Sequence, residues 1–483
     1  MSAGKLRLAA IPQINSTSLS WPLILLVGLT LLRGLLYLSI FPPFLAPDES
    51  AHFEAIRLIG QERKWPTATV YSVTPMHPDM AATFEKFRIW SLVDLYSPTR
   101  NLGVASNLFV DYYPTQIAAG EVVANSYLML YHLILAPLSA ATASFDLVTQ
   151  VYLLRLVSVL FAMGTLVMAW FTVRSIFPAE PALALAVGAF ITFWPMHTHV
   201  DASIAVDPLA ELIASAFFLV LVTIYLKGFS RVRAILLLAL LTLAVLTKPT
   251  LFFLFPTLAV ALIIFFSRRL KWPTRVIGGV LALLFMLTLV GSIVLYENSV
   301  GGRKLLSIFS FNLLLPNWSS FVAVEAVPLY LQSLNFAVVS FAGLFGWSNI
   351  HVSWAWVRFW AILLFLIILG SLIFIYQQVL TPGQQRYELS SLQRKILVIF
   401  IFALIFSFIG AVVPIIATQS PTWGIHSRYY FPVVIPLALY LFFGFRQLFP
   451  FRFRHLALPV WAMGWFIYDS LVLLLVILPY LFS

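Results

Sequence analysis

The sequence predicts an all-α polytopic membrane protein with about eleven transmembrane helices, and three observations support this fold class. Of the 483 residues, 61% are hydrophobic and only 10% are charged, whereas soluble proteins contain about 25% charged residues. The apolar residues are grouped into segments of about 20, the length at which an α-helix crosses a bilayer. Lysine and arginine collect between alternate segments, as expected for short cytoplasmic loops. There is no cysteine, which excludes a disulfide framework and a thiolate metal site.

The apolar segments can be followed in order along the chain. The first, 21–41, comes after Lys5 and Arg7 and is longer than the core of a signal peptide, so we expect a retained helix with a cytoplasmic N-terminus. Lys248-Pro249 interrupts the stretch 234–266, which predicts two short helices with a turn between them. The remaining segments centre near 150–173, 182–198, 208–226, 276–295, 355–375, 396–417, 431–445 and 457–480.

The charge distribution predicts a single transmembrane domain, 1–483, with three notable loops. Lysine plus arginine exceed aspartate plus glutamate by 29 to 18, which in a soluble protein could indicate nucleic acid. Here the basic residues lie in the predicted cytoplasmic loops and most acidic residues lie on the other face, so no nucleic-acid partner is expected. The outer face then carries a large first loop, 42–148, and a second, 296–353, while 377–395 is a cytoplasmic linker.

The large first loop contains an apolar stretch, 121–140, that does not fit the charge pattern as a span. At 100° per residue, Glu121, Asn125 and His132 lie within about 40° of one another and form one polar stripe. We expect a helix on the outer membrane surface with this stripe facing a cavity. An ordinary core helix is the alternative.

An acidic pair, Asp48-Glu49, stands directly after the first span. One interpretation is that Asp48 caps a short helix, Glu49 to Gly60, where a carboxylate satisfies free backbone N–H groups. The other is a general base, or an anchor for a divalent cation, at the membrane surface. The two interpretations are compatible.

A second group of polar residues lies near the end of the segment 182–198. Asp207 precedes Pro208, a typical helix start that capping alone could explain. His197, His199 and Asp201 suggest zinc, but they lack a fourth ligand at a recognised spacing.

Two basic residues are candidates for binding an anion at the outer face. Lys248 lies between two apolar runs and must reach water or pair with an anion. Arg428, followed by Tyr429, begins a late span after His426, and its planar guanidinium suits a phosphate oxygen pair. An anchor in the interfacial aromatic belt is the alternative for Arg428 and its tyrosines.

The order of these motifs resembles the GT-C superfamily of polytopic glycosyltransferases, which includes protein O-mannosyltransferases and the aminoarabinose transferases of lipid A. The resemblance is greatest to an uncharacterised bacterial branch with a Pro-Asp-Glu-x-x-His signature, matched here by residues 47–52. Further matches are short, and the surface helix reads Asn125-Ser126-Tyr127-Leu128 in place of the Pro-Pro-Leu-Tyr-Tyr of the family. These shorter matches are Asp207-Pro208-Leu209, Leu246-Thr247-Lys248, Phe345-Gly346-Trp347 and Arg428-Tyr429.

The resemblance implies a sugar donor on a polyprenyl phosphate, within the lipid membrane, and inversion at the anomeric carbon. The acceptor is a glycan, lipid or protein on the extracytoplasmic side of a bacterial cytoplasmic (inner) membrane. Asp48 is then the general base, while Arg428 and Lys248 stabilise the leaving phosphate. The residues expected to bind substrate are Glu49, His52, Asp207, Lys248, His426, Arg428 and Tyr429. Some members of the family use a metal, so Mg²⁺ or Mn²⁺ on Asp48, Glu49 and Asp207 stays open beside metal-free catalysis.

Two other classes of membrane protein, besides a non-catalytic scaffold, compete with this interpretation. A transporter predicts ionisable residues deep within spans, for which Arg33, Arg155 and Asp469 are the candidates. A lipid-glycan polymerase or ligase would rely on basic residues in a late outer loop, whereas this chain concentrates acidic residues in the first.

Overall fold

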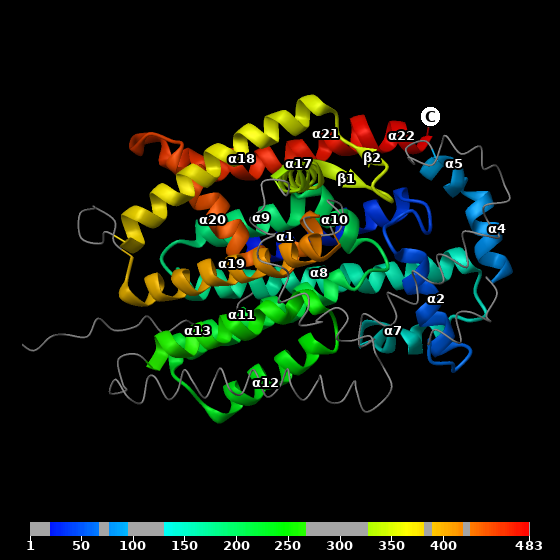
Figure 1. The fold of residues 1–483 in the computed structure, drawn as a ribbon, viewed down its shortest axis with the longest axis horizontal. Coiled ribbons are helices and arrows are strands. Elements are labelled where there is room, and N and C mark those ends of the chain that lie inside the picture. The colour runs from blue at the N-terminus through cyan, green and yellow to red at the C-terminus, as the bar shows by residue number, and fades with distance from the viewer. Residues whose placement is uncertain are drawn as a thin grey trace, which may run out of the picture.

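The computed structural model describes residues 20–66, 77–94, 130–266, 327–380, 389–418 and 426–482, and these are almost entirely helical (Figure 1). The first part contains α1 (Trp21–Ile40), α2 (Glu49–Gly60), α4 (Pro78–Lys86), α5 (Ile89–Asp94), α7 (Leu130–Ala141), α8 (Leu147–Ile176), α9 (Pro181–Phe193) and α10 (Pro195–Asp201). The middle contains α11 (Asp207–Lys227), α12 (Arg231–Val245), the 3₁₀-helix η2 (Pro249–Phe253), α13 (Leu254–Phe266), α17 (Val327–Gly343) and the strands β1 (Leu344–Phe345) and β2 (Ile350–His351). The last part contains α18 (Trp354–Ile375), η4 (Tyr376–Leu380), α19 (Ser391–Thr418), η5 (Ser427–Val433), α20 (Val434–Gln447), η6 (Phe451–Leu456), α21 (Ala457–Val472), η7 (Leu473–Ile477) and α22 (Leu478–Phe482).

Eight helices in the described part of the chain are long and apolar enough to cross a membrane, which indicates a multi-pass membrane protein. A ninth span results if α9 and α10, bent by 65° at a break of the helix, are counted together. Every predicted segment within the described residues is helical, whereas 276–295 lies outside them. The predicted segment 234–247 forms α12, whose 15 residues extend about 22 Å and fall short of a hydrocarbon core of about 30 Å.

Segments predicted for opposite sides of the membrane lie at opposite ends of the molecule. Figure 1 shows α2, α4, α5 and α7 at one end of the long axis. The connections from α11 to α12 and from α20 to α21, which carry basic residues such as Arg231 and Arg452, lie at the other end. The predicted turn at Lys248-Pro249 is confirmed, because α12 ends at Val245 and η2 begins at Pro249.

The long helices pack closely where small or ionisable residues permit it. Gly370 of α18 and Gly444 of α20 leave no room for a Cβ atom against the facing backbone, so these two helices are in direct contact. Arg33 of α1 forms an ion pair with Asp469 of α21, and the Tyr37 hydroxyl donates to the same carboxylate at 2.8 Å. Arg33 and Asp469, two candidates for a transport pathway, therefore join the first span to the last.

Candidate functional site

Asp48 occupies the N-cap position of α2, which has the predicted bounds, but its side chain does not cap the helix. Its backbone is in the left-handed region, with φ of 60°, and its side chain makes no capping hydrogen bond. The Asp48 carboxylate instead accepts a hydrogen bond of 3.0 Å from the Arg428 guanidinium and keeps 44% of its side-chain surface exposed. The capping interpretation is therefore wrong, and the acidic side chain faces a cation from the far end of the chain.

The neighbouring Glu49 is fully buried and holds in place the loop between α1 and α2, which carries Asp48. One carboxylate oxygen accepts from Arg155 Nε at 2.7 Å and the Ile204 N–H at 3.0 Å. The other oxygen accepts from the second Arg155 nitrogen at 2.7 Å and from the Phe44 N–H at 2.9 Å. Arg155 also donates to three backbone carbonyls at the end of α1, those of Leu38, Phe41 and Pro42. A bidentate pair of this kind fixes orientation as well as position.

Lys248, Arg428 and Tyr429 lie together beside Asp48. The Tyr429 ring centroid is 5.5 Å from Lys248 Nζ and 5.4 Å from the Arg428 guanidinium carbon. Both cations therefore make cation–π contacts with the same ring. Lys248 also forms a buried ion pair with Asp207, which is the first residue of α11, so the N-cap position belongs to Val206. The capping interpretation of Asp207 is therefore wrong as well.

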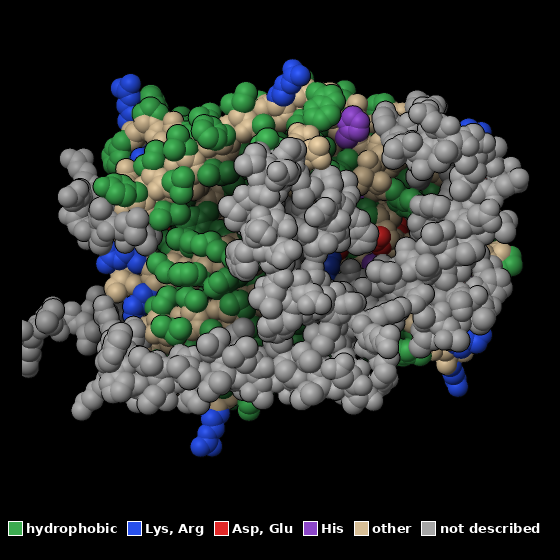
Figure 2. Space-filling model, in the orientation of Figure 1, with side chains coloured by type: hydrophobic (Ala, Val, Ile, Leu, Met, Phe, Trp, Pro, Cys, Tyr) green, Lys and Arg blue, Asp and Glu red, His purple; other side chains and the backbone are tan. Residues whose placement is uncertain are grey.

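The charges around Asp48 favour its ionised form. Partial loss of hydration by itself raises the pKa of Asp48, but the positive charges of Arg428 and Lys248 outweigh that effect and hold the pKa below its usual range. In the hollow right of centre in Figure 2, acidic, basic and histidine side chains are visible together, between the positions of α10 and α2 in Figure 1. The site can therefore offer a carboxylate and cations to one polar ligand.

His52 lies one helical turn after Asp48 and contacts His132 of α7. His52 Nδ1 is 3.0 Å from His132 Nε2, and both side chains are buried. Burial lowers the pKa of His52 to about 4, although the carboxylates of Asp48 and Asp207 oppose this effect. Burial and His52 together hold the pKa of His132 well below its usual range. Of the predicted polar stripe, His132 contacts His52, while Glu121 and Asn125 lie outside the described residues.

The neutral histidine pair predicts a loss of stability in acid. Unfolded His52 gains its proton near pH 6.5 and folded His52 only near pH 4, so the unfolded state binds more protons between these values. We expect the free energy of unfolding to fall by about 2 kcal/mol between pH 7 and pH 4.5 through this group. His52→Gln should reduce that fall, measured by thermal unfolding in detergent, and the exposed His455→Gln should not. Equal pH dependence in all three proteins would contradict the assignment.

The remaining predicted residues hold the backbone around the site through hydrogen bonds. His426 caps η5, because its Nδ1 accepts from the Arg428 N–H at 3.2 Å. His199, which the sequence suggested for zinc, accepts from the Gly346 N–H at 3.2 Å instead. Gly346 has φ of +61° in the turn between β1 and β2, and the next residue, Trp347, donates to the Phe44 carbonyl at 2.9 Å. The Phe-Gly-Trp segment therefore forms a hairpin against the loop that carries Asp48.

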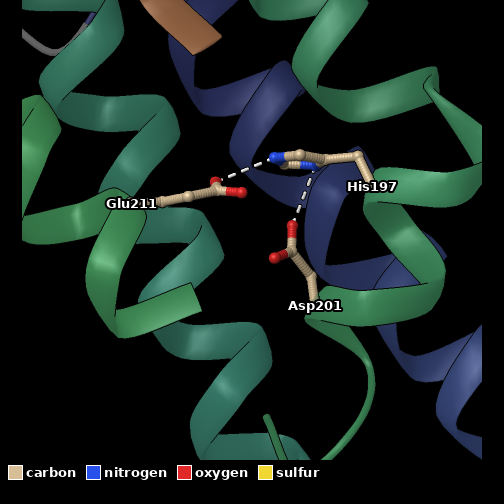
Figure 3. A group of neighbouring side chains, drawn as sticks. All are labelled: His197, Asp201 and Glu211. Carbon is tan, nitrogen blue, oxygen red and sulfur yellow. Dashed lines mark hydrogen bonds and ion pairs between the residues drawn. The ribbon is translucent and has the colours of Figure 1, made fainter. Parts of the chain in front are cut away.

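A second cluster of ionisable residues, His197, Asp201 and Glu211, lies at the bend of the α9–α10 span (Figure 3). Asp201 and Glu211 each lie 2.9 Å from one of the two His197 ring nitrogens. From sequence, only Arg33, Arg155 and Asp469 stand out as deep ionisable residues, and Glu211 in α11 escapes notice. A carboxylate inside an apolar span is the signal that could have identified it.

The structure thus brings together Asp48, Asp207, Lys248, His426, Arg428 and Tyr429 and places His52 within electrostatic reach of the same charges. Glu49 belongs to the framework below them, because the four hydrogen bonds from Arg155, Phe44 and Ile204 use both carboxylate oxygens. Comparison of the chain with protein-family models, with curated proteins and with solved structures finds no match.

Proposed function

We propose that the protein is an inverting membrane glycosyltransferase that transfers a sugar from a polyprenyl-phosphate donor to an acceptor hydroxyl. The acceptor is a glycan, lipid or protein on the extracytoplasmic face of a bacterial cytoplasmic membrane. The observation that carries the proposal is the partly exposed Asp48 carboxylate, 3.0 Å from Arg428 and close to a second cation, Lys248. Sugar transfer from a lipid phosphate needs this combination of a base and a phosphate-binding charge.

The reaction assigns a role to each charged group. Asp48 takes the proton of the acceptor hydroxyl while its oxygen forms a bond to the anomeric carbon. The bond from that carbon to the phosphate oxygen breaks, and the electron pair leaves with the lipid phosphate. Arg428 stabilises the added negative charge, since a guanidinium can hold two phosphate oxygens at once. Lys248 adds a second positive charge, reduced by its ion pair with Asp207.

Arg428 also couples binding of the donor phosphate to the basicity of Asp48. Before the donor binds, its ion pair with Asp48 keeps the carboxylate deprotonated. A donor phosphate that shares Arg428 weakens its attraction for Asp48, so the carboxylate becomes a stronger base in the complex. The base is therefore strengthened when the leaving group is in place.

A metal ion shared by Asp48, Glu49 and Asp207 does not fit the residues as they are arranged. Glu49 accepts four hydrogen bonds through its two oxygens, and the Asp207 carboxylate pairs with Lys248. Arg428 and Lys248 already supply positive charge to the other two carboxylates, those of Asp48 and Asp207. The proposed reaction therefore contains no step through a metal at this site.

The direct test is donor consumption by the purified protein. The full chain in nanodiscs receives a radiolabelled sugar on polyprenyl phosphate together with envelope lipids and glycans as acceptors, and we expect release of polyprenyl phosphate and labelled product. Proteoliposomes loaded with the same donor test for translocation in parallel. Movement of intact donor across the bilayer without cleavage would identify a transporter and would refute the proposal.

Substitution of Arg428 separates phosphate binding from general charge effects. We expect Arg428→Gln to lower kcat/KM for the lipid donor by about 10²–10³-fold, because one preorganised cation at the leaving group is lost. Arg428→Lys keeps the charge but not the planar pair of donors, so a smaller loss is expected. The exposed Arg452→Gln serves as the matched control. Full activity of Arg428→Gln would remove Arg428 from the reaction.

A further inference from the structure

The cluster of His197, Asp201 and Glu211 is separate from the residues assigned to sugar transfer. His197 and Asp201 are four residues apart on α10 and share one face of it, while Glu211 reaches them from α11 (Figure 3). All three are buried, with exposures of 1%, 4% and 0%. The Trp194 ring stacks on His197, and Phe431 packs edge-on against it, which keeps the imidazole in a fixed orientation.

The hydrogen bonds within this cluster leave it incomplete. Each carboxylate uses one oxygen to reach His197, at 2.9 Å in both cases. Within the described residues, the second oxygens, Asp201 Oδ1 and Glu211 Oε1, are buried without a hydrogen-bond partner. In Figure 3, one oxygen of each carboxylate is joined to His197 by a dashed line and the other is not. Glu49, whose two oxygens accept four hydrogen bonds, shows how a carboxylate of this chain is satisfied when its role is to hold the fold.

The charge of the cluster favours a cation over a further hydrogen-bond donor. Two ionised carboxylates with a charged imidazole leave one buried negative charge, which is costly in a low-dielectric interior. A divalent cation with a neutral imidazole and two carboxylates makes the group neutral. It also gives the second carboxylate oxygens a partner, so it resolves the charge and the hydrogen-bond deficit together.

The three side chains lie near enough together to converge on one ion. One ligand atom from each residue lies within 4.8 Å of the other two. Tetrahedral ligands at 2.0–2.2 Å from an ion are about 3.3–3.6 Å apart, so binding an ion would draw the three side chains together by up to about 1.5 Å. One imidazole with two carboxylates is a ligand set of zinc and manganese rather than of magnesium, which prefers oxygen and water.

We propose that His197, Asp201 and Glu211 bind one divalent transition-metal ion, Zn²⁺ or Mn²⁺. The ion joins α10 to α11 at the bend of the α9–α10 span, one turn after Asp207 and next to Phe431 of η5, the helix that carries Arg428. The ion is separate from the sugar-transfer site and links α10 to α11, the helix that also carries Asp207. The inference does not rest on the proposed function, because bound metal can be counted without any turnover.

The first test counts metal in the full-length protein. Protein purified in detergent is stripped with EDTA, incubated with ZnCl₂ or MnCl₂, desalted and analysed by mass spectrometry of the metal. We expect one equivalent per chain and a higher unfolding temperature. Glu211→Gln and Asp201→Asn, which keep side-chain volume, should weaken binding at least about 100-fold. Asp207→Asn, a buried carboxylate one turn earlier in α11, is the control and should retain the ion.

A second measurement keeps the proposal testable if the variants fail to fold. Pulsed electron paramagnetic resonance of Mn²⁺ bound to the wild-type chain should show coupling to a single imidazole nitrogen. That coupling should disappear in His197→Gln and persist in His199→Gln. Wild-type protein that retains no metal, Mn²⁺ without nitrogen coupling, or equal binding by Glu211→Gln and Asp207→Asn would each overturn the assignment.

Discussion

Asp48→Asn is expected to lower the rate of sugar transfer by about 10²–10⁴-fold, the usual contribution of a general base. Asparagine preserves the shape of the side chain but cannot accept the proton of the acceptor hydroxyl. The Asp48 side chain is 44% exposed, and exposed ion pairs contribute about 0–1 kcal/mol, so stability should hardly change. Polyprenyl phosphate released per minute by the purified variant, compared with the wild type, is the measurement.

The control for this substitution is an acidic residue of the same loop outside the site. Glu85 of α4 is exposed, and Glu85→Gln should turn over at the wild-type rate. Asp48→Glu retains a carboxylate on a side chain that is longer by one methylene. Its turnover rate should lie between those of Asp48→Asn and the wild type. If Asp48→Asn keeps full turnover while Arg428→Gln loses it, the lipid phosphate site stands and the base must be sought elsewhere.

Glu49→Gln is expected to have the opposite profile, with a large cost in stability. Removing one partner of a buried ion pair leaves an uncompensated charge and costs about 3–5 kcal/mol. Here the orphaned group is Arg155, which is fully buried and also holds three backbone carbonyls at the end of α1. Unfolding of the detergent-solubilised protein by increasing denaturant should show this loss directly.

A double substitution separates the charge from the shape of this pair. Glu49→Met combined with Arg155→Met removes both charges, so it should be more stable than Glu49→Gln alone. The α1 carbonyls lose their donors in this variant, which should prevent full recovery of wild-type stability. A Glu49→Gln protein as stable as the wild type would show that the pair does not hold the loop.

Local features of the fold could be predicted from sequence because they depend on neighbouring residues. The Asp48-Glu49 pair and Gly60 gave the bounds of α2, and Pro249 located the turn after α12. The number of spans was harder, because α12 is apolar like the others but only 15 residues long. Whether an apolar helix reaches across a bilayer depends on its exact ends, which hydropathy does not define.

The chemistry of the candidate site depended on contacts that no local pattern encodes. Asp48 and Glu49 are adjacent, yet one faces Arg428 and the other Arg155. As a result, one is partly exposed and the other is buried and saturated. Glu211 was overlooked because it is a single charge in a helix that otherwise reads as a continuous span, and only the packing of α10 on α11 shows its partners. The sequence therefore located these charged residues but not the partner of each.

The distance along the chain between Asp48 and its partner has a consequence for biosynthesis. Arg155 follows Glu49 by 106 residues, and Arg428 follows Asp48 by 380. At translation rates of about 5–20 residues per second, Arg428 is synthesised roughly 20–80 s after Asp48. The loop that carries Asp48 is thus anchored early, through Arg155 of α8, while Arg428 arrives late. A nascent chain arrested before η5 would carry Asp48 on an anchored loop without Arg428. Under the proposed function, such a chain could not turn over its donor at the full rate.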